Sequence, residues 1–177
     1  AIQTINAHID ALSAQFVSRR ALLELIVLGL IAQEHVLLIG PPGTGKSAAV
    51  HAVASAMDAE TFDYLLGRFT EPSELFGALD LNALKDGRIE PVTSGMLPQA
   101  EVAFLDEIFK ASSSILNALL TILNERTYHN GTEALDVPLQ ALIAASNELP
   151  TGQEELEALY DRFLVRSFVD YVSAENM

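Results

Sequence analysis

A phosphate-binding loop is the feature that most constrains what this chain can fold into. Residues 40–47 match the pattern Gly, four residues, Gly-Lys-Ser/Thr, and they read Gly40, Pro41, Pro42, Gly43, Thr44, Gly45, Lys46 and Ser47. An apolar run of strand formers at 35–39 precedes the loop, and the helix-like residues 47–54 follow it. This strand–loop–helix setting argues against an accidental Gly/Pro loop.

The residues of the loop are predicted to contact bound phosphates in different ways. Glycine at 43 and 45 lets the backbone turn its N–H groups inward, and the positive end of the following helix adds to their pull on phosphate oxygens. Lys46 is expected to reach the β- and γ-phosphates. The Ser47 hydroxyl is expected to ligate Mg²⁺.

Composition indicates one folded domain. The chain has 177 residues, a hydrophobic fraction of 50% and a mean hydropathy of +0.27, which exclude wholesale disorder. There are no cysteines, so disulfides and thiolate metal sites are excluded, and we expect a cytoplasmic protein. The four histidines are scattered, without the spacing of a metal site.

The charge of the chain bears on its partners. Formal net charge is −14, with 24 acidic against 10 basic residues, and Arg19-Arg20 is the only basic pair. We therefore expect no nucleic acid as main partner, because a duplex-binding protein usually carries a basic face. The longest apolar run, 25–32, is too short to span a bilayer, so no membrane segment is expected.

Strand-like and helix-like segments alternate along the chain. Periodicity predicts helices at 4–18, 19–33, 46–57, 112–126 and 153–160, and strands at 35–39, 61–66, 102–105, 140–146 and 164–169. This alternation predicts an α/β fold with a mainly parallel sheet between two helical layers. In such sheets ligands bind beyond the carboxyl ends of the strands, which is where the loop, Asp106-Glu107 and Asn147 all fall.

The connections carry further signals. Pro72 and Gly77 suit the start and end of a short helix. Residues 78–98 look irregular, with a turn signal at 85–88, and a long irregular segment in a compact domain is usually functional. An Asn-Gly pair at 130–131 predicts a hairpin.

The acidic pair after the third strand is the candidate metal and water site. Asp106 is placed to hold Mg²⁺ beside Ser47, mostly through water. Glu107 is our candidate to polarise the attacking water, since neighbouring residues at a strand end point in different directions. The alternative is a solvated acidic pair in an acidic chain.

Three further polar residues have two interpretations each. Asn147 either bonds the water or a γ-phosphate oxygen, or forms an Asx turn before Pro150. Arg162 suits a trans-acting finger, because arginine stays charged and grips phosphate with a planar fork, or it pairs with the local acids. Arg166 is the alternative candidate for the arginine finger. Arg68 either contributes to an interface or stabilises the fold.

With these residues in hand the chain resembles the AAA+ ATPases, among them the MoxR family, and most of all its regulatory ATPase variant A (RavA) branch. The resemblance covers nearly the whole chain. It is carried by residues 40–47, 68–77, 93–98, 104–111, 119–126, 144–150 and 159–163.

The resemblance implies a five-stranded AAA+ core with an insertion in the second helix, at about 78–98, and a hairpin before the sensor strand, at about 127–138. It implies ATP and Mg²⁺ as cofactors, Asn147 as sensor 1 and Arg162 as arginine finger. It also implies homo-hexameric rings, a partner with a von Willebrand A-type domain and client proteins that are remodelled or matured. We expect the small helical lid of AAA+ proteins to be missing from residues 1–177, because the last core strand is predicted shortly before Met177.

Three functions remain open from the sequence. The first is an ATP-hydrolysing, ring-forming remodelling ATPase, which Glu107 favours. The second is a nucleotide-regulated binding module with little turnover. The third is a nucleic-acid-dependent AAA+ motor, which the net charge of −14 disfavours.

Overall fold

A five-stranded parallel sheet organises the chain. The computed structural model describes residues 2–130, 133–150 and 154–172. The sheet has the order β2-β3-β6-β1-β7, and all neighbouring strands run parallel. Its strands are β2 (Thr61–Leu65), β3 (Val102–Asp106), β6 (Ala141–Ser146), β1 (Val36–Ile39) and β7 (Val165–Phe168). The predicted parallel α/β sheet of five strands is confirmed.

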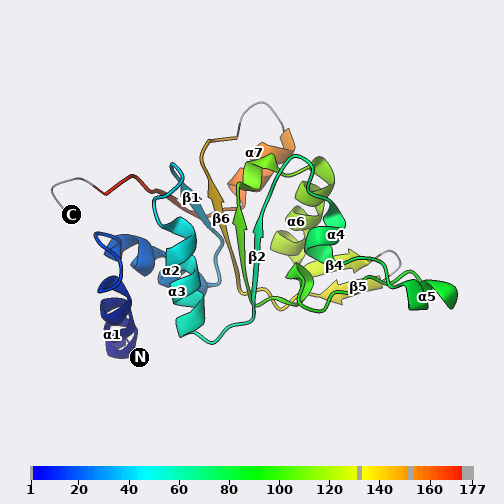
Figure 1. Cartoon of the computed structure of the whole chain (residues 1–177), viewed down its shortest axis with the longest axis horizontal. Helices are drawn as coiled ribbons and strands as arrows, with labels where there is room; N and C mark the ends of the chain where they lie inside the picture. The colour runs from blue at the N-terminus through cyan, green and yellow to red at the C-terminus, as the bar shows by residue number, and fades with distance from the viewer. Residues whose placement is uncertain (1, 131–132, 151–153, 173–177) are drawn as a thin grey trace.

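Helices cover both faces of the sheet, as Figure 1 shows. One face carries α1 (Ile2–Ser13), α2 (Arg20–Ala32) and α3 (Lys46–Ala56), and the other α4 (Pro72–Phe76), α6 (Ser113–Glu125) and α7 (Glu154–Asp161). Successive side chains of β1 enter opposite cores: Leu37 and Ile39 pack with α4, α6 and α7, whereas Val36 and Leu38 pack with α2 and α3. All of β1 and β6 is therefore buried, as expected for strands covered on both faces.

The predicted hairpin is present beside α6. Strands β4 (Thr127–Asn130) and β5 (Glu133–Asp136) pair antiparallel, and their connecting residues 131–132 lie outside the described residues. Tyr128 of β4 stacks on Phe76 of α4, with ring centroids 5.2 Å apart. This aromatic contact fastens the hairpin to the helical layer.

The insertion at 78–98 is more ordered than its sequence indicated. It contains α5 (Leu81–Lys85) and the 3₁₀ turn η1 (Leu97–Gln99), and Leu79 forms an antiparallel bridge with Pro91. The expectation of an irregular segment was wrong here, because Asp80 caps α5 by accepting hydrogen bonds from the backbone N–H groups of Asn82 and Ala83. Figure 1 shows α5 projecting at one end of the molecule.

The first helix is shorter than predicted. The apolar spacing favoured a helix over 4–18, but α1 ends at Ser13 and the chain then turns. Phe16 packs against the core between the sheet and α2 and α3, and Ser18 adopts a left-handed conformation with φ of 55°. Packing of Phe16 against this core is therefore favoured over continuing the helix to residue 18. No helix in the described part of the chain is long and apolar enough to cross a membrane.

Candidate nucleotide-binding site

The loop between β1 and α3 has the conformation that its glycines permit. Gly43 and Gly45 have φ of +76° and +83°, in the left-handed region that other residues rarely adopt. A Cβ added to either would meet nothing within 4 Å, so both glycines border open space. Gly45 is the N-cap of α3, which points the first N–H groups of that helix into this space.

Gly40 serves a different purpose from the other two glycines. A Cβ at this position would lie 2.1 Å from the Val169 carbonyl oxygen, just beyond β7. The Gly40 N–H donates to the Ser146 carbonyl at 2.9 Å, which continues the pairing of β1 with β6. Gly40 therefore lets the loop leave the sheet between the ends of β6 and β7.

Lys46 lies almost fully buried beneath the loop, with 5% of its surface exposed. Its Nζ donates to the carbonyls of Gly40 at 2.7 Å and Pro41 at 2.8 Å. Burial lowers the pKa of Lys46, while the carboxylates of Asp106 and Glu107 act in the opposite direction. Lys46, Asp106 and Glu107 line the same cavity.

The acidic pair sits at the carboxyl end of β3. Asp106 Oδ1 accepts a hydrogen bond of 2.9 Å from the Glu107 N–H. Glu107 has φ of +56° and begins the 3₁₀ turn η2 (Ile108–Lys110). A left-handed conformation at a residue other than glycine is uncommon and concentrates at functional sites, where it redirects a side chain.

Both oxygens of the Glu107 carboxylate are engaged. Asn147, just after β6, donates from Nδ2 to Glu107 Oε1 at 2.5 Å. Lys110 Nζ lies 3.3 Å from Glu107 Oε2. Strands β3 and β6 are direct neighbours in the sheet, which is why residues 40 positions apart in sequence meet here.

The phosphate loop, the acidic pair and Asn147 line one cavity of about 320 Å³. Its walls are formed by Pro42, Gly43, Thr44, Gly45, Lys46, Ser47, Ala48, Asp106, Glu107 and Asn147. The Ser47 hydroxyl and Asp106 carboxylate are oxygen donors suited to Mg²⁺, which is usually held by one or two carboxylates together with phosphates. The described residues contain no cluster of three or more His, Cys, Asp or Glu that could hold a metal alone. The donor set fits a metal that arrives with phosphates.

A second cavity, of about 350 Å³, adjoins the same loop. Gly43, Thr44 and Gly45 share it with residues that sequence reasoning did not assign to a site: Gln15, Phe16, Val17, Arg19, Tyr171 and Val172. Arg19 donates from Nη2 to the Asp170 carbonyl at 2.7 Å and so ties the α1–α2 loop to the segment after β7. Aromatic and aliphatic walls suit a flat heterocycle. The Arg19-Arg20 pair in an acidic chain was the one sequence signal for this region.

The structure separates the two arginines that competed for the finger role. Arg166 donates from Nε to the Phe163 carbonyl at 2.7 Å, lies 3.7 Å from Asp161 and stacks over the Tyr160 ring at 3.9 Å. Arg162 is exposed and takes part in none of the ion pairs found among the described residues. Neither arginine lines the loop cavity.

Fold and site together define a class. A parallel sheet of order β2-β3-β6-β1-β7, a phosphate loop after β1, an acidic pair after β3 and a polar residue after β6 are the parts of an AAA+ P-loop ATPase core. The sequence profile of a family described as "MoxR domain in the MoxR-vWA-beta-propeller ternary systems" matches residues 3–177. The chain belongs to this MoxR family of AAA+ ATPases.

Individual relatives match nearly the whole chain. An uncharacterised protein of Methanocaldococcus jannaschii is 49% identical over 170 residues, covering 95% of this chain and 44% of the relative. The chaperone MoxR1 of Mycobacterium tuberculosis is 30% identical over 182 residues, covering 99% of this chain and 46% of that protein. The chain thus spans less than half the length of these relatives.

Solved structures share the fold. The crystal structure of a proposed ATPase from Cytophaga hutchinsonii has a TM-score of 0.76 and 26% identity, over 98% of this chain and 53% of that one. A mutant RuvB from Thermotoga maritima has a TM-score of 0.62 and 20% identity, over 91% and 49% of the two chains. The similarity to RuvB is evidence for the fold alone.

Proposed function

We propose that this chain binds ATP with Mg²⁺ and hydrolyses the γ-phosphate, as the motor core of a ring-forming MoxR ATPase. The observation that carries the proposal is the meeting of Lys46, Asp106, Glu107 and Asn147 around one cavity. Lys46 begins the helix after β1, and the other three residues lie at the ends of β3 and β6; each has the chemistry that phosphoryl transfer needs.

Nucleotide binding begins with the loop. The backbone N–H groups at the start of α3 hold phosphate oxygens, and Lys46 exchanges the carbonyls of Gly40 and Pro41 for the β- and γ-phosphates. Ser47 and Asp106 hold Mg²⁺, which when bound neutralises charge on the phosphates. The adjoining cavity at Phe16 and Tyr171 receives the base and ribose, because it shares the loop as a wall.

Hydrolysis is assigned to Glu107 and Asn147. Glu107 accepts a proton from the water that attacks the γ-phosphorus, and Asn147 orients the water or a phosphate oxygen. In the present arrangement Asn147 and Lys110 occupy both Glu107 oxygens. Each oxygen keeps a further lone pair, but both contacts favour the charged carboxylate, so the release of either one makes Glu107 a stronger base.

Membership of the family supports the proposed assembly and partners. Arg162 reaches the site of a neighbouring subunit in a homo-hexamer, and its exposure without a partner among the described residues supports this role over Arg166. The family description pairs MoxR with von Willebrand A-type proteins, so we propose such a partner, with chaperone-like remodelling of client proteins in the cytoplasm. Membership of the RavA branch stays a prediction.

The test of this function mixes two inactive variants. In a lid-containing form, Arg162→Ala and Glu107→Gln should each lose ATP turnover, while mixed rings regain part of it, because some sites combine an intact Glu107 with an intact neighbouring Arg162. Phosphate release is the measurement. No recovery in rings shown to be mixed would place the finger elsewhere, with Arg166 next. A wild type that binds ATP without releasing phosphate would favour the regulated binding module.

A further inference from the structure

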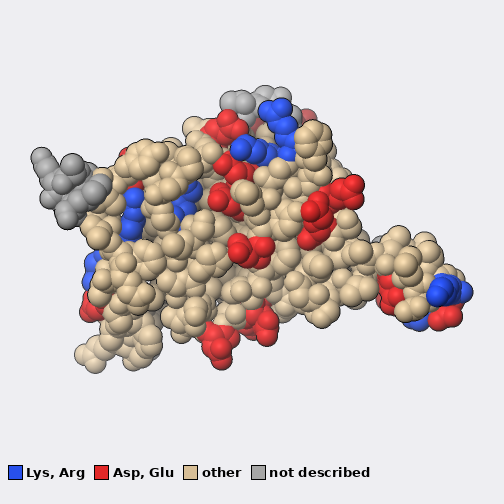
Figure 2. Space-filling view, in the orientation of Figure 1, with Lys and Arg blue, Asp and Glu red and all other residues tan. Residues whose placement is uncertain are grey.

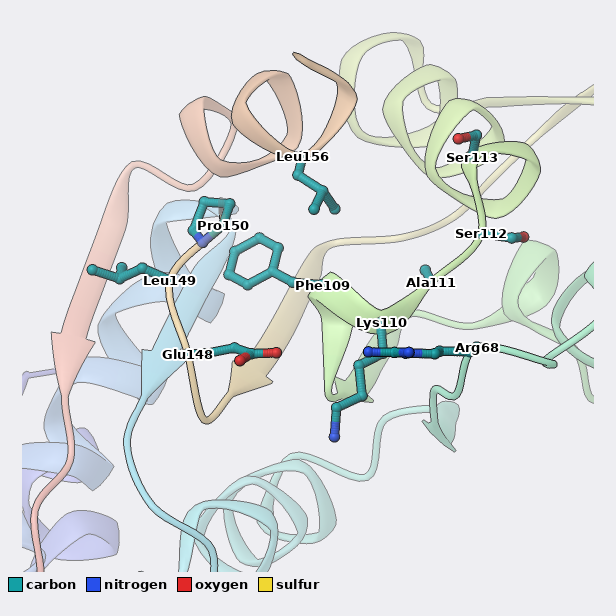
Figure 3. A pocket seen from close by; sticks show the side chains of 10 residues that line it. All are labelled: Arg68, Phe109, Lys110, Ala111, Ser112, Ser113, Glu148, Leu149, Pro150 and Leu156. Atoms are coloured by element: carbon teal, nitrogen blue, oxygen red, sulfur yellow. The ribbon is translucent and has the colours of Figure 1, made fainter. Parts of the chain in front are cut away.

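A larger cavity, of about 550 Å³, lies next to the nucleotide site on the side of α6 and α7. Figure 3 shows that its lining comes from the loop after β2, from η2 and the start of α6, from the loop after β6 and from α7. Arg68 and Lys110 provide its basic groups, and Phe109, Pro150 and Leu156 an apolar wall. None of the functions assigned above uses this space.

The charge of the cavity runs against that of the chain. Arg68 takes part in no ion pair found among the described residues, although Glu148 lines the same cavity. The lining holds two cations, Arg68 and Lys110, and one carboxylate, Glu148; Lys110 also pairs with Glu107 outside the lining, which leaves Arg68 as the lining cation without an ion pair in the described part of the chain, in a protein whose formal net charge is −14. Figure 2 shows a small group of basic side chains near α7, bordered by acidic ones. Such a spot attracts anionic groups.

Lys110 connects this cavity to the catalytic carboxylate. In the 3₁₀ turn η2, residues three apart lie above one another, which brings Lys110 Nζ within 3.3 Å of Glu107 Oε2. The Lys110 side chain is 40% exposed and that of Glu107 only 13%. A lysine on a flexible stem can therefore turn toward the cavity, whereas Glu107 stays in place.

We propose that the cavity binds an acidic peptide segment of a partner protein, and that this segment draws Lys110 away from Glu107. Carboxylates of the segment pair with Arg68 and Lys110, and Glu107, no longer paired with Lys110, becomes a stronger acceptor for a proton from water. Partner binding thereby raises ATP turnover. The coupling rests on the role of Glu107 proposed above, whereas the binding site itself does not.

The shape of the cavity favours a peptide over a small inorganic anion. Its volume of about 550 Å³ exceeds what one phosphate or sulfate fills. The wall of Phe109, Pro150 and Leu156 offers apolar contact beside the two cations. A segment that alternates carboxylate and aliphatic side chains matches both features.

Binding is tested directly on this chain, without nucleotide. The probe is a fluorescein-labelled peptide Glu-Leu-Glu-Leu-Glu, compared by anisotropy at fixed ionic strength with Gln-Leu-Gln-Leu-Gln. We expect tighter binding of the acidic peptide, and a loss of roughly tenfold in Arg68→Gln and in Lys110→Gln, the usual size for a hydrogen bond to a charged group. The matched control is Arg88→Gln, whose arginine pairs with Glu90 in the insertion and should leave binding unchanged. Equal binding of the two peptides, or an equal loss in the control, overturns the site.

Coupling is tested by ATP turnover in the full-length protein. The acidic peptide should raise kcat and leave KM for ATP unchanged, and Lys110→Arg should keep this response. Lys110→Gln should raise basal kcat roughly two- to fivefold, as expected for losing a partly exposed ion pair, and should no longer respond to the peptide. If Lys110 served only to stabilise the fold, Lys110→Gln would instead lower kcat. If the peptide binds and kcat does not change, the coupling is wrong. If the wild type shows no turnover, the proposed function is wrong, and the anisotropy measurement still decides whether the cavity binds the peptide.

Discussion

The nucleotide site and the projecting insertion are built in opposite ways. The nucleotide site joins Lys46, Glu107 and Asn147, which are far apart in sequence and meet because β1, β3 and β6 are parallel neighbours. The insertion is held by local contacts: the Asp80 N–H donates to the Glu90 carbonyl and the Val92 N–H to the Ala78 carbonyl, each at 2.8 Å. A change in the insertion therefore need not disturb the site.

The two regions also expose different surfaces. The nucleotide cavity is lined by backbone, hydroxyl, amide and charged groups. The insertion exposes apolar side chains at Leu79 (53%), Leu81 (69%), Leu84 (47%), Ile89 (61%) and Val92 (49%). Apolar groups gathered on a projection suit contact with another protein. The insertion thus offers an apolar contact surface that is separate from the nucleotide cavity.

The largest effect is expected from removing the charge beneath the phosphate loop. Lys46→Ala should abolish tight ATP binding, because the buried ammonium group is the main positive charge for the phosphates. Isothermal titration with ATP and Mg²⁺ is the measurement, with Lys85→Ala in the insertion as control. Micromolar binding retained by Lys46→Ala would break the distinction between the two regions.

Glu107→Gln should separate binding from chemistry within the site. Glutamine keeps the size but loses the carboxylate, so turnover in a lid-containing form should fall on the order of 10²-fold or more while ATP still binds. Phosphate release is followed together with ATP affinity. Unchanged release would move the general base to another residue.

Gly40→Ala should reveal how tightly the sheet edge is packed. The added Cβ would lie 2.1 Å from the Val169 carbonyl, and forcing such a contact costs about 1 to 3 kcal/mol in the free energy of unfolding. The control is Gly67→Ala, whose nearest neighbour would be Thr70 Oγ1 at 3.7 Å. Urea denaturation compares the two, and equal stabilities would contradict the close approach.

Acidification should destabilise the sheet through His35. This residue precedes β1, accepts a hydrogen bond from the Leu142 N–H at Nδ1 (3.0 Å), and has its pKa lowered to about 4, chiefly by burial and also by Arg126. The unfolded chain takes up the proton near pH 6.5, so the free energy of unfolding should fall as pH drops from 7, by about 2 kcal/mol from this group at pH 5.

The matching measurement is urea denaturation at several pH values. His35→Gln should remove this part of the pH dependence, whereas His129→Gln, an exposed histidine of the hairpin, should keep the wild-type slope. Parallel slopes for wild type and His35→Gln between pH 7 and 5 would contradict the buried neutral histidine.

The smallest effect on the nucleotide site should come from the insertion. Replacing residues 80–90 by a short Gly-Ser link is feasible because Leu79 and Pro91 are paired at its base. ATP affinity should stay within about twofold, since loops on a rigid scaffold tolerate such changes, while capture of a partner protein should be lost. Loss of ATP binding in a folded variant would show that the two regions are not independent.

Much of the site could be predicted because its signals are local. The phosphate loop, Asp106-Glu107 and Asn147 each follow an apolar strand, and parallel topology sends the ends of such strands to one edge. Phe16, Arg19 and Tyr171 were not predicted to line the adjoining cavity, since they lie in irregular segments that only packing brings to the loop. The contact between Lys110 and Glu107 could likewise not be predicted from the sequence, because it depends on the 3₁₀ turn after β3.

By itself the sequence determined the α/β class, the phosphate loop and the acidic strand end, because hydrophobic periodicity and glycine conformation act over a few residues. Tertiary structure alone decided the rest. The order β2-β3-β6-β1-β7 set which strand ends are neighbours, and the close approach of Val169 requires glycine at position 40. Arg166 pairs with Asp161 and Tyr160, whereas Arg162 is exposed. Such contacts join residues distant in sequence, and only the packed chain brings them within reach of one another.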